Sequence, residues 1–186
     1  MPRLLALAVL ALLAAGCGSQ GRPIPTARAA PPQNAELNWL ESYGRGDARI
    51  VFGVDRFQVL ENGWRAEISL SNRTQVRYSV GDPRSSLSRQ WGLMLFQSGD
   101  LRQLEQLNRA GELPPVRPAD TFEPSLPLVI EPDETWKGVI EARGALPAGG
   151  WLRIVFGALV PIGEAPRGFP EQLVWITDHA YQLEGG

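Results

Sequence analysis

Apolar and polar residues alternate along much of the middle of the chain. The clearest stretch is 64–72, WRAEISLSN, where the apolar residues beginning with Trp64 face one way and the intervening polar residues face the other. A period of two over this length is typical of a β-strand with one buried face. The residues before it, Glu61-Asn62-Gly63, predict a tight hairpin that leads into this strand.

A second strand is expected before the hairpin, with an irregularity in its middle. Ile50, Phe52 and Val54 share one face, but the next apolar residues are Phe57 and Val59. One extra residue at 55–56 brings both groups onto the same face, so the pattern predicts a β-bulge at this point.

Further strands follow along the rest of the chain. Each is a short run of alternating or wholly apolar residues bounded by Gly, Pro or acidic turn residues. These strands are expected at 75–80, 91–98, about 128–130, 135–141, 151–160 and 173–181. With the two strands described above, the chain is predicted to contain about eight.

One segment carries a helical pattern instead. Leu101, Leu104 and Leu107 recur at the spacing of a helix face. Asp100 can cap the first turn, and Gly111 can end the last one. The pattern predicts a short crossover helix between two strands.

A second short helix is expected near the start of the domain. Asn34 can cap its first turn and Gly44 can end it. Leu37, Trp39 and Leu40 would form its apolar face. The chain is therefore expected to have one or two short helices.

Short strands separated by turn residues, with so few helices, predict an all-β fold. We expect an antiparallel β-sandwich in a single domain, 36–186. The stretch 129–156, VIEPDETWKGVIEARGALPAGGWLRIVF, resembles the later strands of immunoglobulin-like domains in extracytoplasmic bacterial proteins. The resemblance implies an immunoglobulin-like β-sandwich.

The start of the chain has a different character. Arg3 precedes an unbroken apolar run of twelve residues, 4–15, which ends in small residues. This is the anatomy of a secretory signal peptide, here 1–16. As a helix the run would be about 18 Å long, against roughly 30 Å for the hydrocarbon core of a bilayer. We therefore do not expect it to be a permanent transmembrane span.

The run leads directly to Cys17, the only cysteine of the chain. The stretch LLAAGCGSQ resembles the lipobox of bacterial lipoproteins, with Ala14 at the position where that family usually has Leu. The resemblance implies cleavage before Cys17, a diacylglyceryl group on its thiol, and acylation, for example by palmitate, of the new amino terminus. Two acyl chains are enough for stable anchoring. The alternatives are a transmembrane start, or a plain secreted protein with one leftover thiol.

Residues 17–35 would join this lipid anchor to the domain. The segment is rich in Gly and Pro, and Ile24 is its one large apolar residue. Such a composition cannot bury enough surface to order itself and favours extended polyproline II conformations. We expect a stalk that holds the domain outside the cytoplasm, at the cell membrane or the outer membrane.

The charge balance limits the partners. Removal of 1–16 takes away one basic residue, Arg3, and leaves 17 basic and 20 acidic residues, a net charge of −3. This balance offers neither a counterion-release surface for nucleic acid nor a polybasic patch for anionic lipid. We expect no nucleic-acid partner, and membrane contact through the acyl chains.

Few residues suggest catalysis. His179 is the only histidine, which excludes a multi-histidine metal site, and Asp178 beside it on a strand would point to the opposite face. No Gly-x-Ser-x-Gly elbow is present. Serine catalysis would need an orienting carboxylate and a serine near His179. The candidates are Ser85, Ser86, Ser88 and Ser98. We expect His179 to be solvated or to lie on an edge strand.

Two polar motifs have simple structural interpretations. Glu131, Asp133 and Glu134 crowd one turn, but the spaced ligand loop of a calcium site is missing, so we expect a solvated acidic turn. Asn72-Arg73-Thr74 spells a glycosylation acceptor, and it also fits the end of a strand.

The chain has six tryptophans, which invites comparison with binding faces rich in aromatic residues. Trp64 and Trp175 lie within apolar strand patterns and are expected in the core. The others open or precede elements and are candidates for a rim, although tryptophan is also a common core residue. These four are Trp39, Trp91, Trp136 and Trp151. We expect most of the six in the core.

Taken together, these features predict a non-enzymatic, lipid-anchored binding or adaptor module of the bacterial cell envelope, with Cys17 as the lipid attachment site and no cofactor or metal. Its partner would be an envelope protein or polymer. Two alternatives stay open: a carboxylate-dependent envelope hydrolase, and an accessory subunit of a transport or secretion complex. An exposed apolar patch would favour binding. A pocket holding carboxylates with shifted pKa values would favour catalysis.

Overall fold

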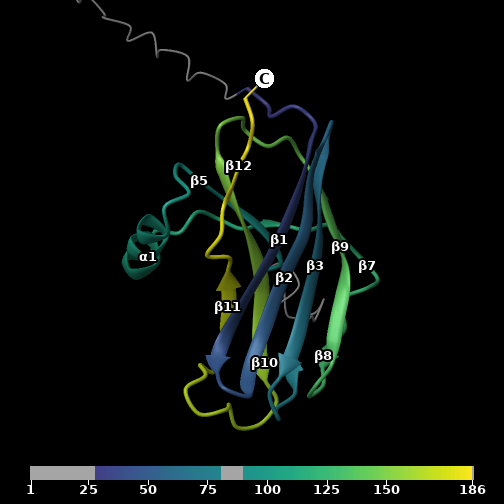
Figure 1. Cartoon of the computed structure of the whole chain (residues 1–186), viewed down its shortest axis with the longest axis vertical. Coiled ribbons are helices and arrows are strands. Elements are labelled where there is room, and N and C mark those ends of the chain that lie inside the picture. The colour runs from purple at the N-terminus through teal and green to yellow at the C-terminus, as the bar shows by residue number, and fades with distance from the viewer. Residues whose placement is uncertain (1–27, 81–89, 186) are drawn as a thin grey trace, which may run out of the picture.

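The computed structural model describes residues 28–80 and 90–185 and shows two antiparallel sheets packed face to face (Figure 1). The predicted β-sandwich is therefore confirmed. The described residues contain one helix, α1 (Leu101–Ala110), and the following twelve strands: β1 (Gln33–Arg45), β2 (Ala48–Leu60), β3 (Gly63–Arg73), β4 (Tyr78–Ser79), β5 (Gly92–Phe96), β6 (Arg117–Pro118), β7 (Thr121–Glu123), β8 (Val129–Ile130), β9 (Thr135–Arg143), β10 (Trp151–Pro161), β11 (Leu173–Ile176) and β12 (Tyr181–Gln182). About eight strands were expected; β4 and β8 lie within the strands predicted at 75–80 and about 128–130, whereas β6 and β7, of two and three residues, were not expected.

The first sheet has the order β1-β2-β3-β9-β7. Its first three strands form a meander, and Leu60 pairs with Gly63 across the predicted hairpin. The second sheet has the order β6-β5-β10-β4-β8. β11 and β12 pair with β10 on the side opposite β5, so the single closing strand predicted at 173–181 is in fact interrupted.

The predicted irregularity in β2 is confirmed. The register with β3 shifts between Val54 and Arg56. As a result the apolar residues on both sides of the shift point into the same core, and each of them is at most 3% exposed: Ile50, Phe52, Val54, Phe57 and Val59.

The segment predicted as a helix at 34–44 is instead the edge strand β1, and this prediction was wrong. Leu37, Trp39, Glu41 and Tyr43 alternate on the more buried side. Leu40, on the other side, is 72% exposed. A carboxylate on the inner face and a leucine on the outer face obscure the period of two, so spacing alone was misleading.

The fold also begins earlier than expected. Ala29 forms a β-bridge with Pro147, and the N–H of Ala30 donates to the carbonyl of Leu146 at 2.7 Å. The last eight residues of the predicted stalk, 28–35, therefore belong to the sandwich. The rest of the predicted stalk, the predicted signal peptide 1–16 and the predicted lipid attachment site Cys17 lie outside the described residues.

The helix predicted at 100–111 is confirmed as α1. Asp100 caps it by accepting a hydrogen bond from the N–H of Arg102 at 2.9 Å, and Gly111 ends it with a φ of 70°. The helix joins β5 to β6, which are neighbours in one sheet, so it is an excursion rather than a crossover. Leu104 anchors it in a small cluster with Met94 and Val155, apart from the main core.

The main core lies between the two sheets and is rich in aromatic rings. Trp91 and Trp136 are 0% and 7% exposed, so the rim position considered for these two residues is wrong. Phe156 lies 5.7 Å from Trp91 and 5.1 Å from Phe52, measured between ring centroids. Gly157 lies under Trp91, where an added Cβ would be 2.1 Å from the indole. Trp64 is buried as predicted. Trp175, also expected in the core, is only half-buried, as are Trp39 and Trp151.

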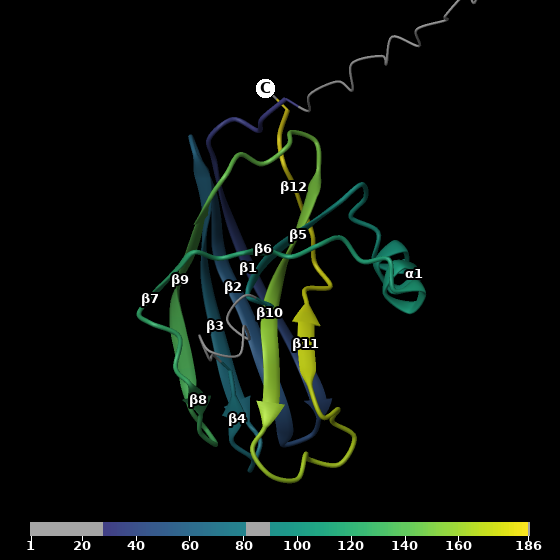
Figure 2. The ribbon, with the colours of Figure 1, turned by 180° about the vertical axis from the view of Figure 1, so that it is seen from behind.

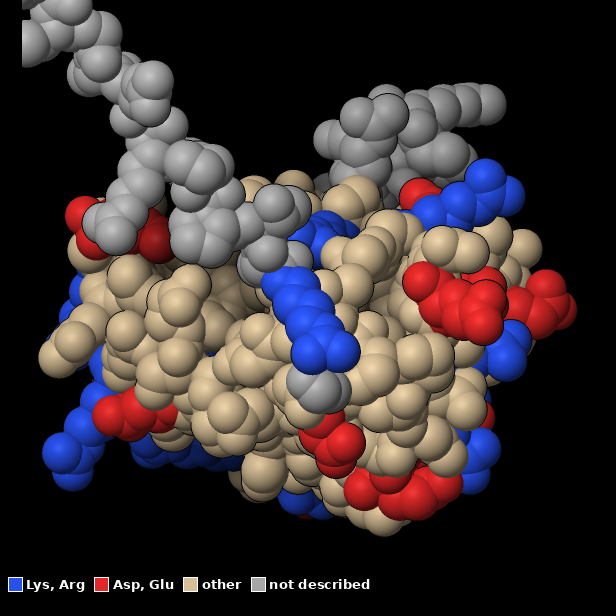
Figure 3. All heavy atoms as spheres, turned by 90° about the horizontal axis from the view of Figure 1, so that it is seen from above, with Lys and Arg blue, Asp and Glu red and all other residues tan. Residues whose placement is uncertain are grey.

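The described chain starts and ends at the same end of the sandwich (Figure 1). The carbonyls of Arg28 and Leu183 accept hydrogen bonds from the neighbouring N–H groups of Ala148 and Gly149, each at 2.8 Å. The β1–β2 hairpin and the loop after β10 lie at the opposite end (Figure 2). Seen from the end with the termini, basic and acidic side chains are interspersed over the described surface (Figure 3).

Candidate functional site

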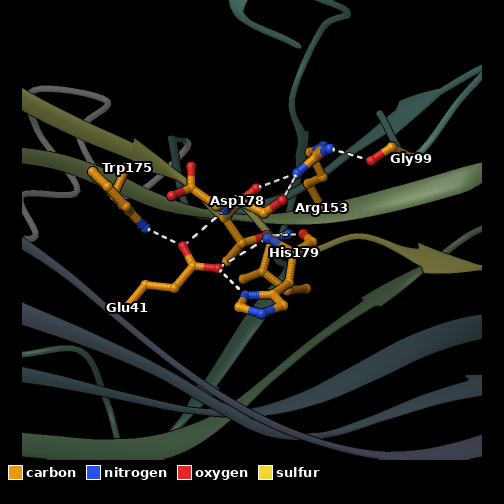
Figure 4. Close-up of polar contacts among 8 residues, drawn as sticks. Glu41, Gly99, Arg153, Trp175, Asp178 and His179 are labelled. Atoms are coloured by element: carbon orange, nitrogen blue, oxygen red, sulfur yellow. Dashed lines mark hydrogen bonds and ion pairs between the residues drawn. The ribbon is translucent and has the colours of Figure 1, made fainter. Parts of the chain in front are cut away.

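One carboxylate of β1 binds the segment between β11 and β12. Only 6% of the Glu41 side chain is exposed. Its Oε2 accepts hydrogen bonds from Nε1 of Trp175 and from the N–H of Asp178, both at 2.8 Å. Its Oε1 accepts from the N–H of His179 at 3.0 Å and lies 2.7 Å from Nδ1 of the same residue (Figure 4). Glu41 thereby joins the free edge of one sheet to the other sheet.

The ring of His179 is held on two sides. It stacks on Trp39 with the centroids 5.5 Å apart and the ring planes 21° apart, and its Nδ1 faces Glu41. The side chain is 58% exposed, so the predicted solvated histidine is confirmed, but its carboxylate partner was not anticipated. Asp178, the neighbour that sequence reasoning considered, forms no side-chain bond with it among the described residues.

A carboxylate and a histidine are two members of the apparatus that activates a serine or cysteine in hydrolases. The third member is not seen at this site within 28–80 and 90–185, because no hydroxyl or thiol there hydrogen-bonds to the His179 ring. Ser98 instead accepts a hydrogen bond from the N–H of Asp100 at 3.0 Å. Ser85, Ser86 and Ser88 lie outside the described residues. In the described chain, then, the pair positions a backbone segment.

A buried arginine holds the same segment from the other side. Arg153 of β10 is 0% exposed. Its Nη1 donates to the carbonyls of Thr177, at 2.7 Å, and Asp178, and its Nη2 donates to the carbonyl of Gly99 at 2.8 Å (Figure 4). Burial lowers the pKa of Arg153, and the negative charges of Asp178, Glu41 and Asp100 oppose that shift. Residues 177–179 are therefore clamped between one cation and one carboxylate.

A groove of about 260 Å³ lies beside the clamped segment, between α1 and β11. Most of its lining is apolar, and Leu101 and Val174 are each 38% exposed. The polar lining residues are Glu105, Asn108 and Asp178. The apolar lining residues are Leu101, Leu104, Leu113, Val174, Trp175 and Ile176. The groove thus combines an apolar wall with two carboxylates and no cation.

The surroundings of Asp178 are unfavourable for its ionised carboxylate. Burial raises the pKa of Asp178, the negative charges of Glu41 and Glu105 raise it further, and Arg153 and His179 lower it. Because Glu105 and Asp178 both line the groove, a positive charge placed there would relieve their repulsion. The groove is suited to a cationic group next to an apolar one.

The acidic turn before β9 is solvated, as predicted, since Glu131, Asp133 and Glu134 are all exposed. Glu131 forms an ion pair with Arg77 at 2.9 Å. Asp133 lies 3.8 Å from Arg73. Among the described residues, no group of three or more His, Cys, Asp or Glu side chains is arranged to hold a metal ion.

The Asn72-Arg73-Thr74 motif lies at the end of β3, as predicted, and has a structural role. Asn72 is 0% exposed. Its Nδ2 donates to the carbonyls of Val76 at 2.8 Å and Glu131 at 3.1 Å. Its Oδ1 accepts from the N–H and the hydroxyl of Thr74 at 3.0 Å and 2.8 Å. The amide therefore ties together three chain segments at the end of the sandwich far from the termini.

Comparison with protein-family models, with curated proteins and with solved structures finds no match to this chain. In the described ranges, no helix is long and apolar enough to cross a membrane.

Proposed function

We propose that this protein is a lipid-anchored, non-catalytic binding or adaptor module of the bacterial cell envelope, and that a partner protein docks in the groove between α1 and β11. The observation that carries the proposal is the groove itself, with exposed Leu101 and Val174 beside the carboxylates of Glu105 and Asp178. The lipobox resemblance around Cys17 supplies the anchor.

The size of the groove favours a protein partner over a small-molecule substrate. At about 260 Å³ it is smaller than the roughly 300–1,000 Å³ that is usual for ligand pockets. It can instead receive an apolar anchor side chain from a protein surface, which is how binding energy is concentrated at many interfaces. The two carboxylates favour a lysine or arginine next to that anchor. We therefore expect a partner segment that presents an apolar residue beside a basic one.

The anchor and the groove are compatible in space. The described chain begins at one end of the sandwich (Figure 1). Between Cys17 and residue 28 lie ten residues, which can span at most about 35 Å. α1 and β11, which border the groove, lie on the side of the body and not at the end where the described chain begins (Figure 2). A tethered domain can therefore meet a partner in the same membrane or next to it.

The anchor is tested by Cys17→Ser in the full chain expressed in a bacterial host. The expected result is loss of incorporation of labelled palmitate and release of the protein from the membrane fraction. Incorporation and fractionation identical to those of the wild-type chain would refute the anchor.

The groove is tested by photo-crosslinking in intact cells. A crosslinking residue at Val174 should give a discrete adduct with an envelope protein, and Glu105→Arg should abolish it, because the basic side chain of the partner is then repelled. The matched control places the crosslinker at Leu128, which is 62% exposed elsewhere on the body. The same adduct from Leu128, or an adduct that survives Glu105→Arg, would refute docking in the groove.

A hydrolase is the second candidate, because the raised pKa of Asp178, caused mainly by burial, and the nearby carboxylate of Glu105 are features of acid–base sites. Purified protein incubated with peptidoglycan distinguishes the two functions. Release of soluble fragments that Asp178→Asn abolishes would replace the binding proposal. If the adduct at Val174 contains a transporter or secretion component, the module is an accessory subunit of that complex.

A further inference from the structure

Another hollow lies at the end of the sandwich opposite the described termini. It encloses about 580 Å³ between the β1–β2 hairpin and the loop that follows β10, both at the lower end in Figures 1 and 2. Its lining comprises Tyr43, Gly44, Arg45, Ala48, Arg167, Gly168 and Phe169. This volume is within the roughly 300–1,000 Å³ that is usual for ligand pockets.

The aromatic wall of this hollow is fixed by contacts between its two sides. The hydroxyl of Tyr43 donates to the carbonyl of Gly168 at 3.3 Å, and the rings of Tyr43 and Phe169 meet edge to face at 5.1 Å. Gly44 has a φ of 107°, and an added Cβ would lie 2.7 Å from the Phe169 ring and 2.3 Å from the carbonyl oxygen of Ala48. Only glycine permits this turn with the ring against it. The loop is therefore packed onto the hairpin.

The charges lining the hollow are all positive. Arg45 and Arg167 contribute guanidinium groups, and no carboxylate is part of the lining. In the described part of the chain neither arginine has a carboxylate within 4.0 Å, whereas Arg56, Arg65 and Arg77 each have one. Both arginines are exposed. Two unpaired guanidinium groups at the mouth of a hollow can bind carboxylates in the bidentate geometry that arginine favours.

We propose that this hollow binds an acidic polysaccharide of the cell envelope. The carboxylates of successive uronic acid units would pair with Arg45 and Arg167, and the C–H face of a sugar ring would pack on Tyr43 and Phe169. The volume accommodates one or two sugar units, which a polymer threaded across the hairpin would present repeatedly.

The position of the hollow identifies the source of the negative charge, and this step rests on the proposed lipid anchor. The described chain begins a few residues before β1, and the hollow lies at the far end of this strand. A strand of 13 residues is about 43 Å long. When the domain extends from its tether, the hollow is the part farthest from the anchor, which favours polymers over the headgroups of the anchoring membrane as the source of the negative charge.

Binding of the full chain, solubilised in detergent, to polygalacturonate tests this proposal by microscale thermophoresis at low and high salt. Neutral dextran and glycerol phosphate, the soluble headgroup moiety of phosphatidylglycerol, are the comparison ligands. We expect binding to polygalacturonate alone, weakened by salt. Arg45→Gln with Arg167→Gln should weaken it roughly tenfold or more, since two charge-assisted contacts are lost. The control, Arg102→Gln with Arg109→Gln, removes two exposed charges from α1 and should bind like the wild type.

Three outcomes would overturn the proposal. These are no binding to polygalacturonate, equal binding to dextran, and equal binding by the two double variants. Preferential binding to glycerol phosphate would also overturn it and would assign the hollow to lipid headgroups instead. Unchanged urea midpoints confirm that the variants are folded. The lipid anchor is tested separately by palmitate labelling, and the α1–β11 groove by crosslinking. A lack of polygalacturonate binding therefore leaves the results of those two experiments unaffected, and a failure of either proposal is seen in its own experiment.

Discussion

Replacement of Glu41 by glutamine tests the clamp that joins the two sheets. The carboxylate accepts from four donors, two on each oxygen, and is almost fully buried. In Glu41→Gln one of these oxygens becomes an NH₂ group, which donates and cannot accept. Two of the four donors then lose their acceptor. The buried charge of Arg153 also loses one of the negative charges that offset its burial.

The expected change in the free energy of unfolding follows from these lost hydrogen bonds. A buried donor left without a partner costs about 1–3 kcal/mol. Nε1 of Trp175 is part-buried, whereas the N–H groups of Asp178 and His179 lie in exposed surroundings and can turn to water. The amide oxygen can keep Nε1 of Trp175 and the N–H of Asp178 as donors, but each bond loses about 1 kcal/mol because its acceptor is no longer charged. We therefore expect Glu41→Gln to lower the free energy of unfolding by about 2 kcal/mol, and Glu41→Ala to lower it by more.

Urea unfolding followed by tryptophan fluorescence measures this loss. The matched control is Glu36→Gln on the same strand, because Glu36 is 54% exposed and pairs with Arg56 at the surface. An exposed ion pair contributes little, so the control should unfold like the wild type. If Glu41→Gln were within about 0.5 kcal/mol of the control, which is the usual range for surface substitutions, the clamp would contribute nothing to stability.

Three further predictions concern the core and the pH dependence, each measured as an unfolding free energy. Gly157→Ala should destabilise the fold by about 1–3 kcal/mol or more, because its Cβ would overlap the indole of Trp91; an unchanged midpoint would mean that Trp91 can move aside. Asn72→Ala should cost about 2–4 kcal/mol, since it leaves buried partners unpaired, and Arg73→Ala is its exposed control. Burial and the charge of Glu41 raise the pKa of Asp178. The folded state therefore binds the carboxyl proton more tightly than the unfolded chain does. As a result, the free energy of unfolding falls as the pH rises from the usual carboxyl pKa to the raised one. Asp178→Asn should therefore be more stable than the wild type at neutral pH and lose this advantage below about pH 4; an advantage that does not change with pH would contradict this assignment.

The elements that were predicted correctly are determined by residues that lie close together in the sequence. The alternation from Trp64 onward, the phase shift at 55–56 and the caps of α1 at Asp100 and Gly111 are all local signals. β3 and α1 each follow from such a signal because one face of each element is consistently apolar.

The elements that were missed depend on contacts between distant parts of the chain. β1 has Glu41 on its inner face because donors from Trp175, Asp178 and His179 meet it there, 134 to 138 residues later. The local hydrophobic pattern contains no sign of partners so distant in the sequence, so the apolar spacing of Leu37 and Leu40 suggested a helix. The groove beside α1 likewise brings residues 101–113 against 174–178, and only the folded chain shows that they meet.

The course of β1 has a mechanical consequence. This strand leaves the end of the body where the chain begins and reaches the hairpin at the opposite end (Figure 1). A force applied between these two ends acts along the strand, and the bonds to β2 lie across that direction. Because both points lie on one strand that is already extended, its covalent backbone carries the tension, and a domain anchored and bound as proposed would transmit a pull without lengthening.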